Sequence, residues 1–499
     1  AVEAQDSGTP ASLGTLALLA TTVPTFCTIS ETLVRLAVAS IPSARCDSSC
    51  SSAVFSVQVL TCLQDITSTF LDMNRGDAQV QQSAVRSCRA LLGCTVRKSA
   101  DPSVQAWSEA ITSRVLTVLR LCLASIPDRE CAAIMGDIVG LLLHGDVAPF
   151  AELVCSDKAV HTSSSLVVLL SSLAMARTAE HLQAVVPLLS QCATGQYPSL
   201  AWTDEQLEHL RTDSYECVHA GTLAHTACKA AGALLNKLDP SGTDAVSSSL
   251  PLQIEHGVAS VPAAVLVVWA LKGLAMRAAP LGYTLLPQVC SVIARADGPV
   301  AHALASGMGT VLADDPSFVL HVRTHARLKP LFHQRFLTTA LACLQSTCAP
   351  DAPSPLAVSA ATGMLAHVPG TVIQGCTAQL LPLLSQGLCV DMCRVDPDAS
   401  ARVLNILADL AATTPDFVSS HLYTFVPLCL PLVHPPHPVQ VRLAAVELLA
   451  ALAGLPFHLV FPHKRDITGA LQGALDDSKR VVRQRAVRAN NTWHMLKRA

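Results

Sequence analysis

One short pattern returns near the end of this chain at an almost fixed interval, and it limits the fold more than any other feature. Three Arg residues, each the second residue of an apolar, Ala-rich run, stand 40 and 41 residues apart: Arg402, Arg442 and Arg483. A self-similar period of about 40 residues is typical of helical-hairpin repeats of the HEAT or armadillo kind. The sequence therefore predicts an all-α, HEAT-repeat (ARM-like) superhelical solenoid.

Prolines repeat this period. The helical run before each return stops at Pro369, Pro415 or Pro456, at spacings of 46 and 41 residues, and Pro240 and Pro280 lie 40 residues apart. Because proline lacks a backbone N–H and clashes with the preceding turn, it marks helix boundaries. Tracing the period over all 499 residues predicts about twelve repeats.

The regularity of the pattern divides the chain into three predicted parts. Residues 1–200 read as less regular HEAT-like repeats, residues 201–355 as middle repeats, and residues 356–499 as regular C-terminal repeats that form a partner-docking end. We expect a helix through 13–19, a break at Pro24, and further helices through 33–38, 57–70, 84–92, 104–125, 131–143, 166–176, 182–189, 227–237, 265–277, 300–312 and 327–344. The run at 265–277 is apolar nearly all round, so we expect it to be an inner helix.

Composition agrees with helices packed on helices. The chain is 51% hydrophobic but only 4% aromatic, so Ala, Leu and Val must supply the core. A formal net charge of −3 gives no global attraction to nucleic acid or to an anionic membrane. Residues 464–499 are locally different, because they hold nine Lys or Arg against three Asp, an excess of +6.

The nineteen cysteines are scattered singly through apolar runs, and no secretory signal precedes them. Reduced, buried thiols in a cytoplasmic and nuclear protein are the favoured interpretation. The uncharged stretches at 7–30 and 159–176 contain prolines or serines, so we expect buried helices there and no membrane insertion. The chain starts at Ala1, and we expect it to begin inside a longer natural chain.

The sequence carries no phosphate-binding loop and no Gly-x-Ser-x-Gly motif, so we predict no catalytic residues, no cofactor and no enzyme activity. Cys46/Cys50 and Cys389/Cys393 have a spacing that permits a metal or cluster ligand pair, yet the two pairs lie over 300 residues apart. We favour plain thiols at both. His434, His437, His458 and His463 lack accompanying carboxylates or thiols, so solvated or core histidines are favoured over a metal site.

The repeated arginines have two interpretations. Asp396 lies six positions before Arg402, and Asp477 lies six before Arg483. We favour a structural ladder, in which each arginine, including Arg442, pairs with an aspartate of the preceding turn or of the adjacent repeat and sets the stacking register. The alternative is a line of phosphate-binding groups.

The densest basic run lies at the C-terminal end and is our candidate for binding a partner: Lys479, Arg480, Arg483, Arg485, Arg488 and Trp493, followed by Lys497 and Arg498. On a helix, the arginines at 480, 483 and 488 share one broad face and Val482, Ala486 and Ala489 another. A solvated face on a capping repeat and a docking surface for an acidic partner both fit this pattern.

Four stretches together resemble a known family: 227–237, 269–277, Phe332–Phe336, and 441–493 with Leu-Asp-Asp-Ser-Lys-Arg-Val-Val-Arg at 475–483. The chain resembles the MMS-nineteen family, the large HEAT-repeat scaffold of the cytosolic iron–sulfur cluster targeting complex. The resemblance is weaker before residue 200, and it implies that this chain corresponds to the C-terminal half of the scaffold.

This resemblance implies a non-enzymatic scaffold. Its expected partners are a small iron–sulfur targeting adaptor with a reactive cysteine, a WD-repeat β-propeller protein, and apo iron–sulfur clients such as DNA replication and repair enzymes. The C-terminal repeats would dock the adaptor, and partners or clients would ligate the cluster. We expect no membrane binding and no direct nucleic-acid binding.

Three alternatives stay open at this point. A transport receptor or phosphatase scaffold would share the architecture but bind other partners. A nucleic-acid-binding solenoid would use the C-terminal arginine face, with an affinity that falls steeply with salt. A metal carrier would use Cys389 and Cys393 and would contain iron or zinc when purified.

Overall fold

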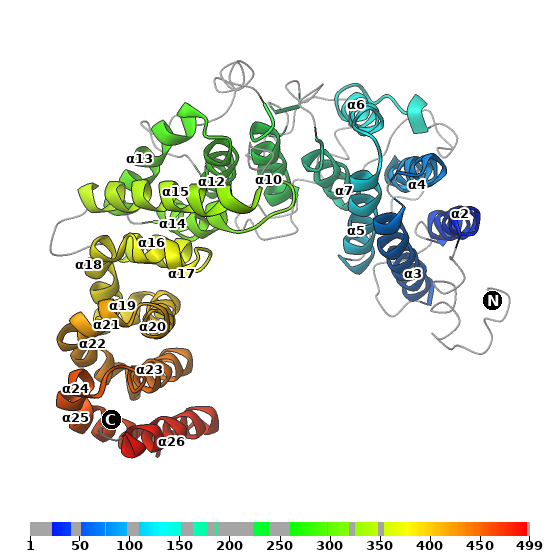
Figure 1. Cartoon of the computed structure of the whole chain (residues 1–499). Helices are drawn as coiled ribbons and strands as arrows, with labels where there is room; N and C mark the ends of the chain where they lie inside the picture. Colours follow the sequence, from blue (N-terminus) through cyan, green and yellow to red (C-terminus); the bar gives the residue numbers. More distant parts are fainter. Residues whose placement is uncertain are drawn as a thin grey trace. The chain divides into compact units, whose positions relative to one another are not determined.

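The computed structural model describes residues 22–40, 51–74, 76–96, 109–150, 163–177, 185–186, 189, 223–238, 260–296, 298–318, 325–347 and 354–496. Every regular element within these ranges is a helix, which confirms the all-α prediction (Figure 1). The chain forms two compact units. The first comprises residues 1–252, 260–273 and 316–319, and the second comprises 253–259, 274–315 and 320–499.

The first unit is built from paired helices: α2 (Val23–Ser40), α3 (Ser51–Met73), α4 (Ala78–Val96), α5 (Glu109–Ser125), α6 (Asp128–His144), the 3₁₀ helix η2 (Ala148–Phe150), α7 (Ser163–Ala174), α10 (Leu223–Leu235) and most of α12 (Val261–Met276). Helices α3 and α4 both pack against α2 and α5, and α7 packs against α10. Phe26 of α2 stacks on Phe70 of α3 with ring centroids 4.3 Å apart.

One described segment of the first unit, Val54–Leu71 in α3, is long and apolar enough to cross a membrane by length and composition. Half of that segment is buried within the unit. Its contacts with α2 and α5 are those of a core helix of a helical protein.

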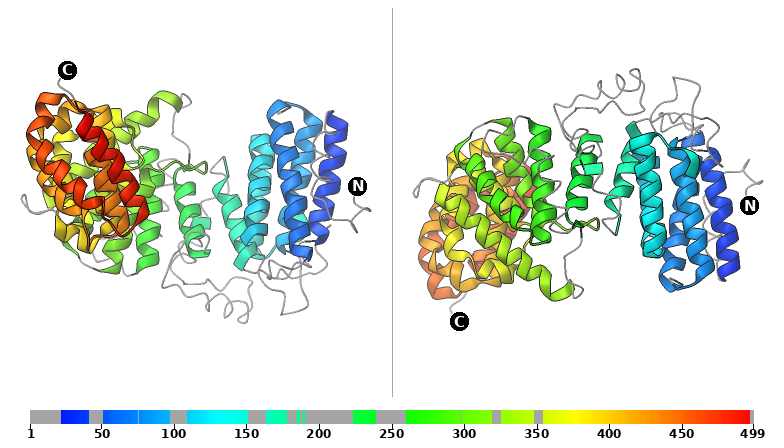
Figure 2. Two further views of the ribbon diagram at one scale, coloured as in Figure 1. Left: turned by 90° about the horizontal axis from the view of Figure 1, so that it is seen from below. Right: turned by 90° about the horizontal axis from the view of Figure 1, so that it is seen from above.

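The second unit contains α13 (Pro280–Arg295), α14 (Pro299–Leu312), α15 (His325–Thr347), α16 (Pro355–Leu365), α17 (Gly370–Gln374), α18 (Thr377–Gly387), α19 (Val390–Val395), α20 (Pro397–Thr413), α21 (Pro415–Ser420), α22 (Leu422–Cys429), η5 (Leu430–Val433), α23 (Val439–Leu452), α24 (Phe457–Val460), η6 (Phe461–His463), α25 (Lys464–Ala474) and α26 (Arg480–Met495). Its helices form two layers (Figures 1 and 2). In one layer α14, α16, α20, α23 and α26 stack in chain order; in the other, α13 packs on α15, and the first helices of the later repeats follow. A helix from each layer forms one repeat.

The first helix of each of the last three repeats is interrupted, whereas the second helix is continuous. Each first helix is broken into α17 and α18, α21 and α22, or α24, η6 and α25, and prolines lie within these pieces at Pro382, Pro427 and Pro462. A proline inside a helix removes a backbone hydrogen bond and clashes with the turn before it. The predicted punctuation is confirmed, because α16, α20 and α23 end just before Pro369, Pro415 and Pro456.

The predicted boundary at Pro24 agrees with the described residues, because α2 begins at Val23 and Pro24 is its second residue, where a proline is tolerated. Helix α13 was not predicted, although Pro280 stands at its start and buried apolar side chains recur along it. Gly282 and Pro287 interrupt that pattern, and both residues usually signal a turn.

Glycine sets the spacing between α14 and α16, which are neighbours in the same layer. A Cβ atom added to Gly309 of α14 would lie 2.7 Å from the carbonyl oxygen of Gly363 in α16. Because a contact this short would force the backbones apart, the two helices can cross this closely only with glycine at position 309. The prediction of an inner helix is also confirmed, since residues 266–275 of α12 are all buried.

Several predictions fall outside the described residues. They include Cys46, Cys50, Lys497, Arg498, the helix through 13–19 and most of the helix through 182–189. The three-part division at residues 200 and 355 stays a prediction.

Candidate functional site

The predicted partner-binding residues all belong to the last repeat. α26 packs on α23 and α25 through Val482, Ala486, Ala489 and Trp493, which are buried. These positions follow the helical spacing that the sequence analysis assigned to the apolar face. The opposite side of α26 carries exposed side chains.

The structure places the five basic residues in different surroundings. Lys479, Arg480, Arg485 and Arg488 are exposed, and Arg483 is half-buried. Arg485 pairs with Glu447 of α23, with its Nε 3.4 Å from the carboxylate. Arg483 donates from one terminal nitrogen to the carbonyl oxygens of Asp477 and Ser478, at 2.6 and 3.2 Å, and so closes the turn before its own helix. Within the described part of the chain, no carboxylate forms an ion pair with Lys479, Arg480 or Arg488.

Trp493 requires a correction, because it does not lie on an exposed surface. Its side chain is fully buried, and its indole N–H donates to the carbonyl oxygen of Leu449 at 2.7 Å. The sequence analysis grouped Trp493 with the arginines on the basis of proximity in sequence. Trp493 instead follows Ala486 and Ala489 by seven and four positions, which is the spacing of the buried stripe.

The sequence analysis missed three exposed apolar side chains on the same helix. Val481, Val487 and Met495 are 53%, 47% and 74% exposed. At 100° per residue they share, with Arg480 and Arg488, the sector opposite the buried stripe. The sequence contains the signal for this, because Val481, Val487 and Met495 do not lie three or four residues from Val482 or Ala486 and so fall outside the buried stripe. We call Arg480, Val481, Val487, Arg488 and Met495 the α26 face.

The arginine ladder contains both kinds of pair that the sequence analysis described. Arg442 of α23 pairs with Asp477, which precedes α26 in the next repeat, and the two side chains are only 6% and 1% exposed. Asp477 also accepts the backbone N–H of Lys479 at 2.7 Å. This single aspartate therefore links one repeat to the start of the following helix.

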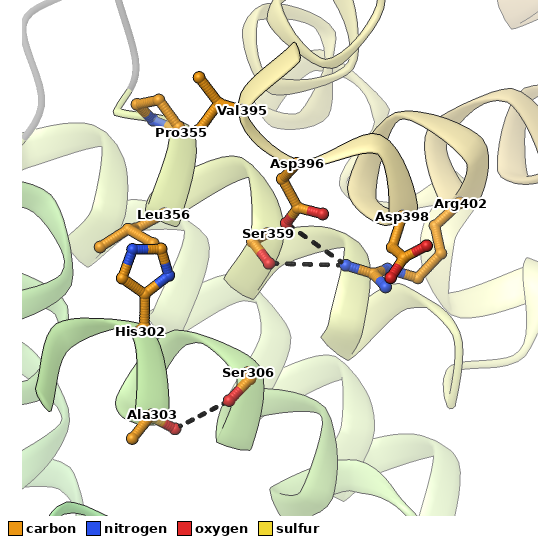
Figure 3. Close-up of a pocket in the computed structure, with 10 residues that line it drawn as sticks. All are labelled: His302, Ala303, Ser306, Pro355, Leu356, Ser359, Val395, Asp396, Asp398 and Arg402. Atoms are coloured by element: carbon orange, nitrogen blue, oxygen red, sulfur yellow. Dashed lines mark hydrogen bonds and ion pairs between the residues drawn. The ribbon is translucent and has the colours of Figure 1, made fainter. Parts of the chain in front are cut away.

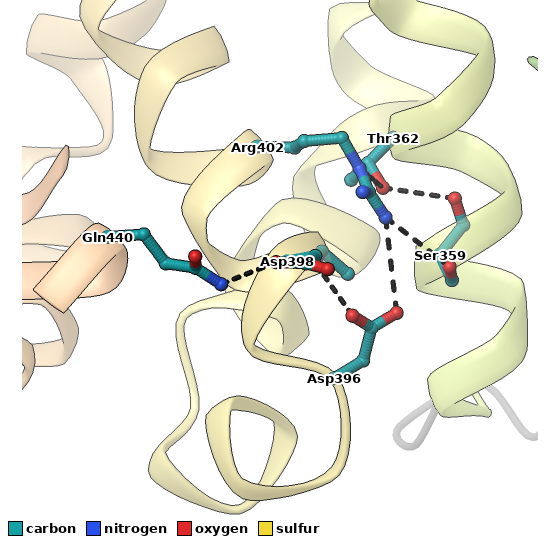
Figure 4. Close-up of polar contacts among 7 residues, drawn as sticks. Ser359, Thr362, Asp396, Asp398, Arg402 and Gln440 are labelled. Carbon is teal, nitrogen blue, oxygen red and sulfur yellow. Dashed lines mark hydrogen bonds and ion pairs between the residues drawn. The ribbon is translucent and has the colours of Figure 1, made fainter. Parts of the chain in front are cut away.

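Arg402 makes different contacts (Figure 4). Its guanidinium lies 3.9 Å from Asp396, in the turn before its own helix, and reaches the hydroxyls of Ser359 and Thr362 in α16 at 3.5 and 3.4 Å. Asp396 also caps α20 by accepting the N–H of Ala399 at 2.9 Å. In the repeat that follows Arg402, the position equivalent to Asp477 is Pro436, so Arg402 cannot form the forward pair that Arg442 forms.

These contacts disfavour the alternative of a phosphate-binding line. Arg442 is buried against Asp477, and Arg402 is held by Asp396 and two hydroxyl groups. An arginine already paired with a carboxylate in the core has neither the exposure nor the net charge to bind a phosphate.

A pocket of about 420 Å³ lies between the first turns of α14, α16 and α20 (Figure 3). Its lining includes His302, Leu356, Ser359, Asp398 and Arg402, together with Val395 and Asp396 before α20. Asp398 accepts a hydrogen bond from Gln440 of α23. Asp396 and Arg402, which also line the pocket, already pair with each other. The pocket therefore indicates no particular ligand.

Cys389 and Cys393 lie one turn apart around α19. Burial raises the pKa of both thiols, and the Asp391 carboxylate adds to the rise at Cys389. The Cys393 sulfur lies 3.3 Å from Nδ1 of His437. No group of three or more metal-ligating side chains converges within the ranges that the structure describes.

Comparison with known proteins gives one family. A family model described as "RNAPII transcription regulator C-terminal" (MMS19_C) matches residues 28–453. The Homo sapiens protein named "MMS19 nucleotide excision repair protein homolog" is 31% identical over 303 residues, which are 58% of this chain and 28% of that protein. The Danio rerio protein of the same name is 26% identical over 399 residues, 78% of this chain and 36% of that protein. The chain thus spans about a third of the length of these relatives.

Solved structures of low identity also align. Kap121p bound to RanGTP covers 94% of this chain and 53% of its own, with 12% identity and a TM-score of 0.42. An engineered protein covers 94% of this chain and 100% of its own, with 14% identity and a TM-score of 0.33.

Proposed function

The chain belongs to the MMS19 family, and on that basis we propose that it is a non-enzymatic scaffold that brings an iron–sulfur cluster carrier together with apo-client proteins. The proposed partners are a small targeting adaptor with a reactive cysteine, a WD-repeat β-propeller protein, and clients among DNA replication and repair enzymes. A scaffold of this kind works by raising the effective concentration of carrier and client, with no bond chemistry of its own. The proposed location is the cytoplasm and nucleus, where these partners would meet.

The observation that carries this proposal is the composition of the α26 face. A helix side that faces only solvent is mostly charged or polar. Here Val481, Val487 and Met495 are exposed beside Arg480 and Arg488. Apolar side chains combined with arginine are typical of protein–protein contact surfaces. This mixture favours the interpretation of the α26 face as a docking surface over that of a solvated face.

The arginines that lack an ion pair are the best places to test docking. We expect Arg480→Glu combined with Arg488→Glu to weaken the complex with the adaptor at least about tenfold, because reversing close interfacial charges costs more than about 1.4 kcal/mol. Arg483 and Arg485 are poorer choices, since both already contact the repeat itself. Light scattering after size-exclusion chromatography, with adaptor and propeller protein added, measures the complex.

The matched control is Arg120→Glu combined with Arg129→Glu. These arginines are exposed on α5 and α6 of the first unit, and the double reversal changes the net charge equally. Loss of binding in both variants would mean that overall charge, and not the α26 face, holds the partner. The absence of any complex with the unaltered, helical chain would contradict the scaffold proposal itself. Binding to labelled single-stranded DNA, with an affinity that falls steeply with salt, would favour the nucleic-acid alternative.

A further inference from the structure

Helices α13 and α15, in adjacent repeats of the second unit, pack side by side in a defined register (Figure 1). The guanidinium of Arg335 in α15 lies over the ring of Tyr283 in α13, 4.5 Å from its centroid. Seven residues further along α13 is Cys290, and eight residues further along α15 is Cys343. Both steps are close to two helical turns, about 11 Å. The register therefore places these two cysteines opposite each other.

Hydrogen bonds agree with this register. The Cys290 thiol lies 3.9 Å from the carbonyl oxygen of Ala340, one turn before Cys343 on the same helix. The Cys290 thiol is also the main influence on the pKa of Cys343, which it lowers as a hydrogen-bond donor. Both residues are in the thiol form; Cys290 is fully buried, whereas Cys343 is half-buried and accessible from solvent.

The hydrogen bond from Cys290 stabilises the thiolate of Cys343. It lowers the pKa of Cys343 from 9.0 to about 7, against the opposing effect of burial. Roughly half of the Cys343 side chains are then thiolate at neutral pH, and the thiolate is the form that reacts. Burial raises the pKa of several other thiols in the described chain, including Cys62, Cys376, Cys389 and Cys393.

We propose that Cys343 is a site of oxidation by hydroperoxides and that Cys290 is its resolving thiol. In the first step the Cys343 thiolate attacks the terminal oxygen of the hydroperoxide. The O–O bond breaks, the leaving oxygen takes a proton to give water or an alcohol, and Cys343 becomes a sulfenic acid. In the second step Cys290 loses its proton and its sulfur attacks the Cys343 sulfur. The S–O bond breaks and water leaves, so two thiols and one hydroperoxide give a disulfide, an alcohol or water, and water.

The chain contains an internal reference for this chemistry. Cys88 and Cys122 in the first unit are also neighbouring thiols, and both are buried. The contact with Cys122 and burial together raise the pKa of Cys88 well above its ordinary value. Proximity of two thiols is therefore common to both pairs, whereas Cys343 differs from Cys88 in its access to solvent and in its lowered pKa.

The test is peroxide treatment of the whole folded chain, followed by blocking of remaining thiols with N-ethylmaleimide and peptide mapping by mass spectrometry. The expected product is a disulfide between Cys290 and Cys343, with Cys88 and Cys122 recovered as blocked thiols. A disulfide at Cys88–Cys122 under the same conditions, or none at Cys290–Cys343, would overturn the proposal.

A second measurement separates reactivity from proximity. The rate of iodoacetamide labelling at Cys343 should rise with pH to a midpoint near 7, and Cys290→Ala should move that midpoint upward because the hydrogen bond is lost. In Cys290→Ala, peroxide should leave a sulfenic acid at Cys343 that dimedone traps. Cys343→Ser removes an accessible thiol, and in that variant Cys290 should stay unoxidised. Circular dichroism verifies that each variant is folded; equal labelling rates at Cys343 and Cys376 in the unaltered chain would contradict the proposal.

Discussion

Arg442 and Asp477 show how much one pair of residues decides in a repeat protein. The aspartate accepts from an arginine of the previous repeat and from the backbone of Lys479, so it joins two repeats and starts α26. Both charges are withdrawn from water, and a buried charge is tolerated only while its partner is present. At the other extreme, Arg394 and Asp391 pair on the surface with side chains that are mostly exposed.

Removal of one partner from the buried pair should therefore be costly. We expect Arg442→Ala to lower the free energy of unfolding of the second unit by about 3–5 kcal/mol, because Asp477 is left as an uncompensated buried charge. Arg394→Ala is the control and should change it by no more than about 0.5 kcal/mol. Urea unfolding followed by circular dichroism measures both. Equal effects of the two substitutions would show that burial of the Arg442 pair has no energetic consequence.

At the scale of elements, packing distance depends on where glycine lies. α14 and α16 approach each other at Gly309 and Gly363, and a side chain at position 309 has no room. Gly469 of α25 is different, since nothing lies within 4 Å of a Cβ added there. The same substitution in a helix can thus have opposite effects at the two sites.

Alanine at these glycines gives a matched comparison. We expect Gly309→Ala to destabilise the chain by about 1–3 kcal/mol, because the added methyl group pushes α14 away from α16. Gly469→Ala should stabilise it by about 0.5–1 kcal/mol, because alanine loses less conformational freedom in a helix. Thermal melting curves of the two variants decide this. A stabilising Gly309→Ala would mean that the two helices separate without loss of packing.

At the scale of the whole molecule, the chain comprises two compact units, and each repeat contacts mainly its neighbours. Stability in such a protein is a sum over repeats and their interfaces, and a single two-state transition is not expected. The effect of a substitution should then fade with distance along the chain.

Hydrogen-exchange rates of individual helices test this prediction. In Arg442→Ala we expect faster exchange in α20, α23 and α26, which adjoin the broken pair, and unchanged exchange in α3, α4 and α5 of the first unit. Mass spectrometry of peptides from each helix resolves the two regions. A similar increase in α3 and α20 would indicate that the two units unfold as one.

The sequence by itself determined the helices, the repeat and the buried stripe of most helices. Val482, Ala486 and Ala489 could be assigned to the core because backbone hydrogen bonds in a helix are local and side chains recur every 3.6 residues. Prolines at positions 369, 415 and 456 marked the repeat boundaries for an equally local reason.

Only the tertiary structure decided which residues meet between repeats. Arg402 turns back to Asp396 while Arg442 reaches forward to Asp477, although both arginines occupy the same place in the repeat. Trp493 was predicted to bind a partner but lies in the core, whereas Val481 of the same helix is exposed. The register of α13 and α15 brings Cys290 close to Cys343. The periodic pattern states which side of a helix is buried, but the register between neighbouring helices depends on how their side chains interlock in three dimensions.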